Sequence, residues 1–361
     1  MTVLLFVAGL TFLILGAEVL VRGSSRLAVL LGISPLVVGL TVVAFGTSSP
    51  ELAVSVKSAL SDQAGIAVGN IVGSNIFNVL FILGISAIIT PLLVSHQLRR
   101  FDVPLMVVLS VIVLAFSLDG NFSRFEGLIL VTSLAIYVWF LIYQSRKETS
   151  VVKGTYVKEA RVAGPVKSNW FINIALVLSG LALLVLGSRW LVDSAVSFAQ
   201  YLGVSELVIG LTIIAVGTSL PEVVTSVIAA IRGERDIAVG NIVGSNIFNL
   251  TMVLGLASVV APKGIDVLAA VSRFDIPVMI AVSIACLPIF FTGGRISRQE
   301  GTLLLGYYVA YTLYLVLAAS HHDAVPRFSL IILCVVIPVT VATMIIAVLR
   351  ELRSRKKGRS E

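Results

Sequence analysis

Residues 39–84 read GLTVVAFGTSSPELAVSVKSALSDQAGIAVGNIVGSNIFNVLFILG, and residues 210–255 read GLTIIAVGTSLPEVVTSVIAAIRGERDIAVGNIVGSNIFNLTMVLG. The two segments align without a gap at a constant offset of 171 residues (210 minus 39). Thirteen consecutive residues, IAVGNIVGSNIFN, are identical at 66–78 and 237–249. Repetition of this kind indicates that one structural unit occurs twice in the chain.

Weaker similarity extends the repeat in both directions. Before the core, LGISPLVVGLT (31–41) matches LGVSELVIGLT (202–212). After it, RRFDVP (99–104) matches SRFDIP (272–277). We therefore expect the repeated unit to occupy most of each half of the chain.

Composition indicates an all-α polytopic membrane protein. The chain has 361 residues, of which 58% are hydrophobic and 12% charged, and its mean hydropathy is +1.05. These values are far from those of a water-soluble domain. Apolar runs near the roughly 20 residues needed to cross a bilayer follow one another along the chain, which predicts about 11 transmembrane helices. They lie near 3–21, 36–59, 68–89, 103–118, 126–143, 171–192, 207–230, 239–261, 276–292, 300–318 and 328–349.

Each repeat contains five of these spans. Because an odd number of crossings precedes the second copy, it enters the membrane from the opposite side, which predicts inverted topology. The expected organisation is a first five-helix repeat (1–143, core 39–84), a cytoplasmic linker (144–168), a second inverted repeat (169–318, core 210–255), and an additional transmembrane helix with a basic cytoplasmic tail (319–361).

Basic residues are distributed unequally between the loops. With the N-terminus outside, 20 of the 26 Lys and Arg residues fall on the inner side and 6 on the outer side. This bias predicts a multi-pass protein of the cell (inner or plasma) membrane, with its N-terminus outside and its C-terminus cytoplasmic. The formal charge of +7 is explained by this bias, and no basic and aromatic groove pattern outside the membrane indicates nucleic-acid binding.

The first motif of each repeat, Gly-Thr-Ser-x-Pro-Glu, lies in the middle of an apolar span. Pro50 and Pro221 each remove a backbone donor, so the carbonyls of the preceding turn need other partners. Glu51 and Glu222 follow these prolines, and a carboxylate at bilayer depth costs on the order of 3 kcal/mol. Protonated, packed glutamates are the alternative interpretation, but the repetition of the motif favours ion binding.

The second motif, Gly-Ser-Asn-x-x-Asn, supplies further oxygen atoms. Ser74 and Asn78 are four residues apart, and so are Ser245 and Asn249, which places each pair on one helical face. We expect Asn78 and Asn249 to contribute to the site. Ion binding and helix packing both stay open for a second group of asparagines, Asn70, Asn75, Asn241 and Asn246.

Every candidate ligand in these motifs is an oxygen atom. Ca²⁺ takes 6 to 8 oxygen ligands in a flexible shell, whereas Mg²⁺ tends to keep its water. Two carboxylates are balanced by one Ca²⁺ or by two Na⁺. The two ions would therefore compete for one cavity, and competition at a site of alternating access produces exchange.

At these motifs the chain resembles the Ca²⁺/cation antiporter superfamily, specifically the sodium/calcium exchangers, including their prokaryotic members. The paired motifs cover 39–84 and 210–255, and weaker similarity extends over roughly residues 1–318. The resemblance implies ten helices in two inverted halves, with ions held by four core helices. It also implies that the first helix of each half, near 3–21 and 171–192, slides to switch access.

The resemblance also assigns residues. It implies that Glu51 and Glu222 are the central Ca²⁺ and Na⁺ ligands and that Thr47 and Thr218 contribute carbonyl oxygens. It implies flanking Na⁺ ligands at Ser48, Ser74, Ser219 and Ser245. Asn78 fits its family position. At position 249 some relatives, including potassium-dependent exchangers, carry Asp, so Asn249 disfavours K⁺ co-transport. The eleventh helix has no family counterpart.

The preferred hypothesis is a secondary active transporter that exchanges Na⁺ for Ca²⁺, without a cofactor or an evident obligate protein partner. The nearest alternatives are Ca²⁺/H⁺ antiport and K⁺-dependent Na⁺/Ca²⁺ exchange at the same site. A passive cation channel would need a continuous pore. An intramembrane enzyme would need acid–base or nucleophilic groups, and the three histidines, His96, His321 and His322, all fall in predicted loops.

Overall fold

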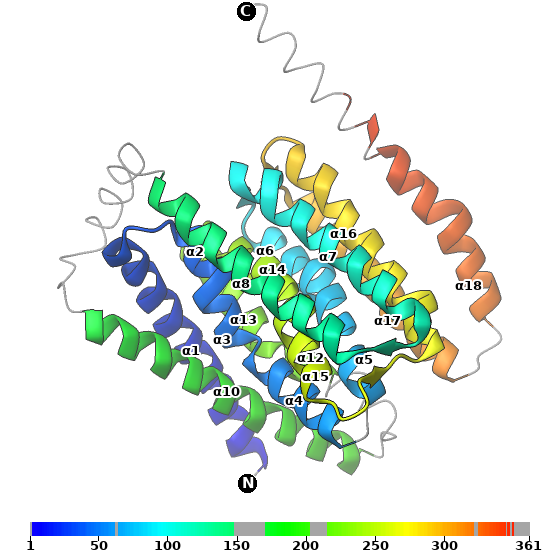
Figure 1. The fold of residues 1–361 in the computed structure, drawn as a ribbon, viewed down its shortest axis with the longest axis horizontal. Helices are drawn as coiled ribbons and strands as arrows, with labels where there is room; N and C mark the ends of the chain where they lie inside the picture. The colour runs from blue at the N-terminus through cyan, green and yellow to red at the C-terminus, as the bar shows by residue number, and fades with distance from the viewer. Residues whose placement is uncertain are drawn as a thin grey trace, which may run out of the picture.

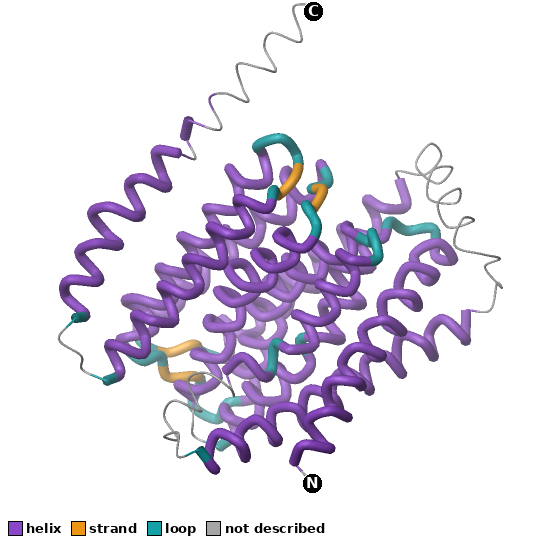
Figure 2. Tube along the Cα trace, turned by 180° about the vertical axis from the view of Figure 1, so that it is seen from behind, coloured by secondary structure: helices purple, strands orange, loops and turns teal. Residues whose placement is uncertain are grey.

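The computed structural model describes residues 2–61, 64–147, 170–202, 215–320, 324–343, 345–346 and 349. Over these residues the protein is a bundle of helices with two short two-stranded ribbons at opposite ends (Figures 1 and 2). Most of the predicted linker and the basic tail after Leu349 lie outside the described residues.

Both halves consist of long helices, some of them interrupted. The first half contains α1 (Thr2–Leu31), α2 (Pro35–Val38), α3 (Ala44–Thr47), α4 (Ser49–Leu60), α5 (Ala64–Phe77), α6 (Gly84–Ile89), α7 (Val103–Phe116) and α8 (Arg124–Lys147). The second contains α10 (Trp170–Tyr201), α12 (Ala215–Gly217), α13 (Leu220–Ile231), α14 (Arg235–Phe248), α15 (Leu254–Val260), α16 (Ile276–Phe291) and α17 (Arg298–Ala319), and the additional helix α18 (Val325–Ile331) follows it.

Short π-helical turns join several of these helices into continuous spans. They are η1 (Gly39–Val43), η2 (Asn78–Leu83), η3 (Leu98–Asp102), η6 (Asn249–Val253), η7 (Val271–Asp275) and η8 (Ile332–Val336). A 3₁₀ turn, η4 (Ser117–Asp119), follows α7. Single π-type turns inside helices are frequent at functional sites. Here η2 and η6 begin at Asn78 and Asn249, the last residues of the repeated Gly-Ser-Asn-x-x-Asn motif.

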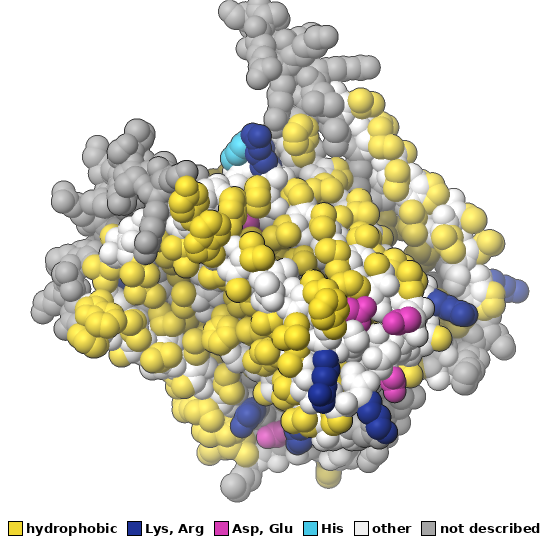
Figure 3. Space-filling view, viewed as in Figure 1, with side chains coloured by type: hydrophobic (Ala, Val, Ile, Leu, Met, Phe, Trp, Pro, Cys, Tyr) yellow, Lys and Arg dark blue, Asp and Glu magenta, His cyan; other side chains and the backbone are white. Residues whose placement is uncertain are grey.

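The helices match the predicted spans. Among the described residues nine helices are long and apolar enough to cross a membrane, and a bent pair, Pro35–Thr47 with Ser49–Leu60, makes a tenth. The one predicted span outside this set is 207–230, whose first residues are not described and whose described part contains α12 and α13. Hydrophobic side chains form a broad band on the face shown in Figure 3, with most coloured charged groups toward its lower edge.

The repeated segments form the centre of the bundle. Of the most apolar 18 residues in each span, 78% are buried in 65–89 and 89% in 235–260. The corresponding share is 28% in the span of α1, 33% in that of α10 and 6% in α17. The span of α18 has none buried, and Figure 1 shows this helix at the outer edge, beyond α17. The segments with the strongest repetition are therefore shielded from lipid on nearly every side.

The first helices of the two halves, α1 and α10, pack along each other at one edge of the bundle (Figure 1). A Cβ atom added to Gly9 would lie 2.8 Å from the Gly187 carbonyl oxygen, and one added to Gly16 would lie 2.9 Å from that of Gly180. Glycine permits this close backbone approach. Because residue numbers rise along one helix as they fall along the other, the two helices run antiparallel, as opposite orientation of the halves requires.

Two ribbons connect the halves at their ends. Strand β1 (Leu92–Leu93) pairs with β4 (Arg295–Ile296), and β2 (Asn121–Phe122) pairs with β3 (Ile265–Asp266). Each ribbon joins two loops that the charge distribution assigns to the same side of the membrane, the inner side for β1 and β4 and the outer side for β2 and β3.

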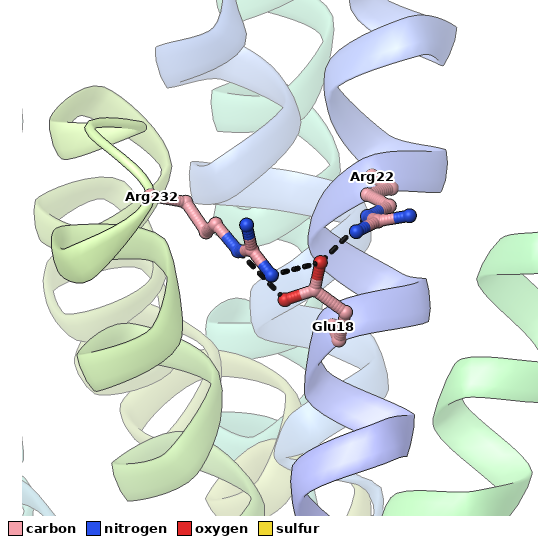
Figure 4. Close-up of polar contacts among 3 residues, drawn as sticks. All are labelled: Glu18, Arg22 and Arg232. Atoms are coloured by element: carbon pink, nitrogen blue, oxygen red, sulfur yellow. Dashed lines mark hydrogen bonds and ion pairs between the residues drawn. The ribbon is translucent and has the colours of Figure 1, made fainter.

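Helix α1 is also attached to the second half by polar contacts. Glu18 lies between Arg22 of α1 and Arg232 at the end of α13, with N···O distances of 2.6 and 2.7 Å (Figure 4). Two turns further along α1, the Ser25 hydroxyl donates to Glu234, which follows α13, at 2.7 Å. The contacts of Glu18 with Arg232 and of Ser25 with Glu234 bridge more than 200 residues of sequence and fix the end of α1 beside α13.

Candidate functional site

The proline of each first motif interrupts its helix, as the sequence predicts. Helix α3 ends at Thr47 and α4 begins at Ser49, and the two are bent by 45°. In the second half α12 ends at Gly217 and α13 begins at Leu220. Ser48 and Ser219 leave the helical conformation, with ψ near 6° in both. Glu51 and Glu222 then lie in the first turn of the following helix, where the helix dipole favours a negative charge.

The two carboxylates are buried and are bound by serines from opposite halves. Glu51 and Glu222 are each 1% exposed. The Ser219 hydroxyl donates to Glu51 Oε1 at 2.8 Å, and the Ser48 hydroxyl donates to Glu222 Oε1 at 3.1 Å. The Ser74 hydroxyl oxygen lies 3.5 Å from Glu51 Oε1 and 3.1 Å from the Ser219 hydroxyl oxygen. The interruptions of both helices therefore meet at one place, and each half binds the glutamate of the other.

Four acceptor oxygens on the repeated motifs have no hydrogen-bond partner among the described residues. They are Glu51 Oε2, Glu222 Oε2, Asn78 Oδ1 and Asn249 Oδ1. All four residues are 1% exposed. A buried polar atom without a partner costs about 1–3 kcal/mol, and a charged one costs more. Two carboxylate and two amide oxygens of this kind, paired by the repeat, form a set that a cation would satisfy.

The threonines of the first motif bind asparagines of the opposite half. The Thr47 hydroxyl donates to Asn241 Oδ1 at 3.1 Å, and the Thr218 hydroxyl donates to Asn70 Oδ1 at 3.3 Å. Asn70 in turn donates to Ser55 at 3.1 Å, and Asn241 donates to Ser226 at 2.9 Å. Of the two interpretations left open for Asn70 and Asn241, helix packing accounts for these contacts.

All ten predicted site residues lie on these central segments. Hydrogen bonds between the two halves join the glutamates, serines and threonines, whereas Asn78 and Asn249 bond Asn246 and Asn75. Ser245 is the most loosely connected of them, 3.5 Å from the Thr47 hydroxyl. Sequence reasoning missed three hydroxyl groups. Ser55 and Ser226, which hold the two asparagines, could have been found because they occupy equivalent places in the repeat. Ser188 of α10 could not, because its donation to the Gly217 carbonyl at 2.7 Å has no repeated counterpart.

The oxygen atoms of the cluster are of the kind that hard cations prefer. Its groups are carboxylates, amides and hydroxyls. Among the described residues no group of three or more His, Cys, Asp or Glu side chains is placed to hold a metal ion. Zinc and other softer metals are usually held by histidine nitrogens and cysteine sulfurs, and the cluster contains neither. Oxygen ligands from several helices are typical of Ca²⁺, which accepts an irregular shell.

Comparison with known proteins agrees with this chemistry. The model of the family described as sodium/calcium exchanger protein matches residues 1–143 and 172–317. Inner membrane protein YrbG of Escherichia coli strain K12 is 36% identical over 309 residues, covering 85% of this chain and 94% of YrbG. Sodium/calcium exchanger MaX1 of Methanosarcina acetivorans is 35% identical over 347 residues, covering 86% and 97%.

A solved structure supports the same assignment. The sodium-calcium exchanger NCX_Mj, soaked with zero Na⁺ and Ca²⁺, superposes with a TM-score of 0.75 at 29% sequence identity. The match covers 87% of this chain and 98% of that one. With a family model that spans both halves and a relative of full length, the chain belongs to the sodium/calcium exchanger family of membrane ion transporters.

Proposed function

We propose that this chain exchanges Na⁺ for Ca²⁺ across the membrane by alternating access at the cluster around Glu51 and Glu222. Membership in a family of exchangers makes the chain a transporter and not an enzyme. The observation that carries the choice of site is the set of four buried acceptor oxygens without partners, on Glu51, Glu222, Asn78 and Asn249. A cation that visits the site supplies the missing partner.

Charge explains why two different ions would use one site. Two ionised glutamates require a charge of +2, which one Ca²⁺ or two Na⁺ supplies. Serine hydroxyls and threonine carbonyls next to the glutamates add neutral oxygens for Na⁺. Because either occupant relieves the same electrostatic penalty, occupation by one ion excludes the other, and the ions are transported in alternation.

Access from alternate sides would come from the peripheral helices. We infer that residues 1–143 and 169–318 form oppositely oriented halves, with the N-terminus outside and the C-terminus cytoplasmic. The antiparallel packing of α1 and α10 and the pairing of β1 with β4 support this arrangement. The α1 and α10 pair lies at the edge of the bundle, so its movement against the buried core would break contacts such as that of Ser188 with Gly217 and keep the hydrogen bonds between the glutamates and serines.

The experiment is Ca²⁺ uptake into proteoliposomes with Na⁺, K⁺ and H⁺ gradients imposed one at a time. We expect the Na⁺ gradient to drive uptake without K⁺, and Glu51→Gln to abolish it. Glu126→Gln serves as the control because Glu126 bonds the Ser123 backbone at the start of α8, away from the cluster. Uptake driven only by the proton gradient, or uptake that requires K⁺, would replace Na⁺/Ca²⁺ exchange with one of the alternatives.

A further inference from the structure

Four asparagines form a closed network where the two repeated segments cross. They are Asn75, Asn78, Asn246 and Asn249, and each is 1–2% exposed. Asn78 Nδ2 donates to Asn246 Oδ1 at 2.9 Å, and Asn249 Nδ2 donates to Asn75 Oδ1 at 3.1 Å. Each pair joins one half of the protein to the other, and the offset of 171 residues converts the first pair into the second.

The two middle members of this network, Asn75 and Asn246, donate hydrogen bonds to backbone carbonyls. Asn75 Nδ2 donates to the Asn246 carbonyl at 3.4 Å, and Asn246 Nδ2 donates to the Asn75 carbonyl at 3.4 Å. The same amide groups contact the sulfurs of Met279 and Met106, at 3.6 and 3.4 Å. A carbonyl oxygen and a thioether sulfur can only accept hydrogen bonds. The amino end of each middle asparagine must therefore face them.

This requirement propagates along the network. Since the amino end of Asn246 is held by the Asn75 carbonyl, its oxygen faces Asn78, which must turn its own amino end toward that oxygen. The Oδ1 of Asn78 is then left facing away from the network, and it is one of the four oxygens without a partner. Reversing Asn246 would place oxygen against oxygen and nitrogen against nitrogen.

We propose that Asn75 and Asn246 are positioning residues that turn the cation-facing asparagine of the opposite half so that it presents oxygen and not nitrogen. Asn246 orients Asn78, and Asn75 orients Asn249. The proposal rests on the cation site proposed above and adds the means by which its amide ligands become acceptors. It also explains why the stretch containing these four asparagines is identical in both repeats, since each asparagine needs its equivalent in the other.

The test uses the difference between an amide and a carboxylate. An amide ligand works only in one orientation, whereas a carboxylate carries oxygen at both ends. We expect Asn246→Ala to weaken equilibrium Ca²⁺ binding by the detergent-purified full chain by about tenfold or more, the usual effect of losing a group that orients a metal ligand. In an Asn78→Asp background the same change should cost at most about twofold, because a carboxylate needs no orienting partner.

A matched control uses the other ligand. In an Asn249→Asp background Asn246→Ala should keep its full effect, since Asn249 is oriented by Asn75. The reciprocal set, Asn75→Ala with Asn249→Asp, provides the same test if Asn246→Ala does not fold as judged by thermal unfolding. A loss of equal size in all three backgrounds would mean that Asn246 only packs, and would overturn the proposal.

Equilibrium binding separates this test from that of the function. If the wild-type chain binds Ca²⁺ but a Na⁺ gradient drives no uptake, the exchange proposal fails and the positioning test stands. If exchange is observed and Asn246→Ala acts equally in every background, only the positioning proposal fails. A wild-type chain that binds no Ca²⁺ would overturn both.

Discussion

The two halves of the protein agree closely at the cluster and differ at the helices that flank it. Each hydrogen bond described between Ser219 and Glu51, or Thr47 and Asn241, has a partner bond at equivalent positions in the other half. The agreement extends outward to two Asp–Tyr pairs, in which Tyr137 donates to Asp102 and Tyr311 donates to Asp275. The cluster proposed as the binding site is thus built by symmetry, with each half completing the other.

Helices α1 and α10 approach each other symmetrically, with Gly9 at Gly187 and Gly16 at Gly180, but their contacts with the core do not share this symmetry. Glu18 of α1 is paired with Arg232, whereas the equivalent residues in the repeat are Arg189 and Ser61, which cannot form an ion pair. On α10, the Leu181 side chain packs against Gly46, and the Val192 side chain packs against Gly217. Both contacts use the space that a glycine leaves free. The α1 residue equivalent to Leu181 is Leu10, which is 43% exposed.

This difference indicates how the work is divided between the two regions. A site that must hold the same ions from either side benefits from a fixed, symmetric set of ligands. Access from one side at a time requires the opposite, because symmetric surroundings would open both sides equally. A symmetric core, with asymmetric contacts between that core and the α1 and α10 pair, is what the proposed alternating access requires.

The largest expected effect tests the symmetry of the core. Glu51→Gln and Glu222→Gln each leave a single buried carboxylate and remove half the charge that balances Ca²⁺. Removing one member of a buried charged set costs about 3–5 kcal/mol, so each should weaken Ca²⁺ binding by at least about 100-fold. Equilibrium Ca²⁺ binding measures both. Loss in one variant and near-normal binding in the other would show that the halves are not equivalent at the site.

A smaller effect is expected from the serines that bind these carboxylates. Ser48→Ala removes the hydroxyl bound to Glu222, and Ser219→Ala removes the one bound to Glu51. A hydrogen bond to a charged group contributes about 1.5–3 kcal/mol, so Ca²⁺ affinity should fall by roughly 10- to 100-fold in both. The double variant measures whether the two losses add. Ser49→Ala is the control, because its hydroxyl bonds the Phe45 carbonyl on the exposed side of the bend.

The contact between α10 and the first motif of the second repeat should matter less. Ser188→Ala leaves the Gly217 carbonyl without its donor, which should lower the free energy of unfolding by about 0.5–1.5 kcal/mol. Thermal unfolding in detergent measures this change. The equivalent residue on α1 is Ala17, and introducing a hydroxyl there with Ala17→Ser should not restore the stability of Ser188→Ala. Full recovery would mean that α1 and α10 make the same contact after all.

The smallest effect concerns the ion pairs of α1. The side chain of Arg232 is 54% exposed, so its pairing with Glu18 should contribute at most about 1 kcal/mol. If these contacts favour the described position of α1, Arg232→Gln should shift the ratio of half-saturating Ca²⁺ concentrations on the two membrane sides by up to about fivefold. The shift should shrink at high ionic strength. Arg189→Gln should not change the ratio, and an equal shift in both variants would remove the asymmetry.

Much of this arrangement could be predicted from the repeat. The prolines predict the breaks before Glu51 and Glu222, and the cost of burying two carboxylates predicts that they meet. The sequence does not indicate which serine hydroxyl bonds which glutamate. Ser48 lies three residues before Glu51 on the same segment, and nothing in the local pattern indicates that it bonds Glu222 instead.

Contacts that occur only once were the hardest to foresee. Glu18 and Arg232 are 214 residues apart and belong to no repeated motif. The orientation of the asparagine amides also depends on backbone carbonyls from the other half, which become neighbours only after both segments have packed. Repetition identifies the residues of such a site, and packing decides how they are paired.

The most direct measurement is Ca²⁺ binding by the purified chain at increasing Na⁺ concentrations, with and without Glu51→Gln. Competition for two carboxylates predicts that Na⁺ displaces Ca²⁺, that the apparent Kd for Ca²⁺ rises with about the second power of Na⁺ concentration, and that the variant loses Ca²⁺ binding. Ca²⁺ binding that is insensitive to Na⁺, or that survives in Glu51→Gln, would contradict a shared site at the meeting point of the two halves.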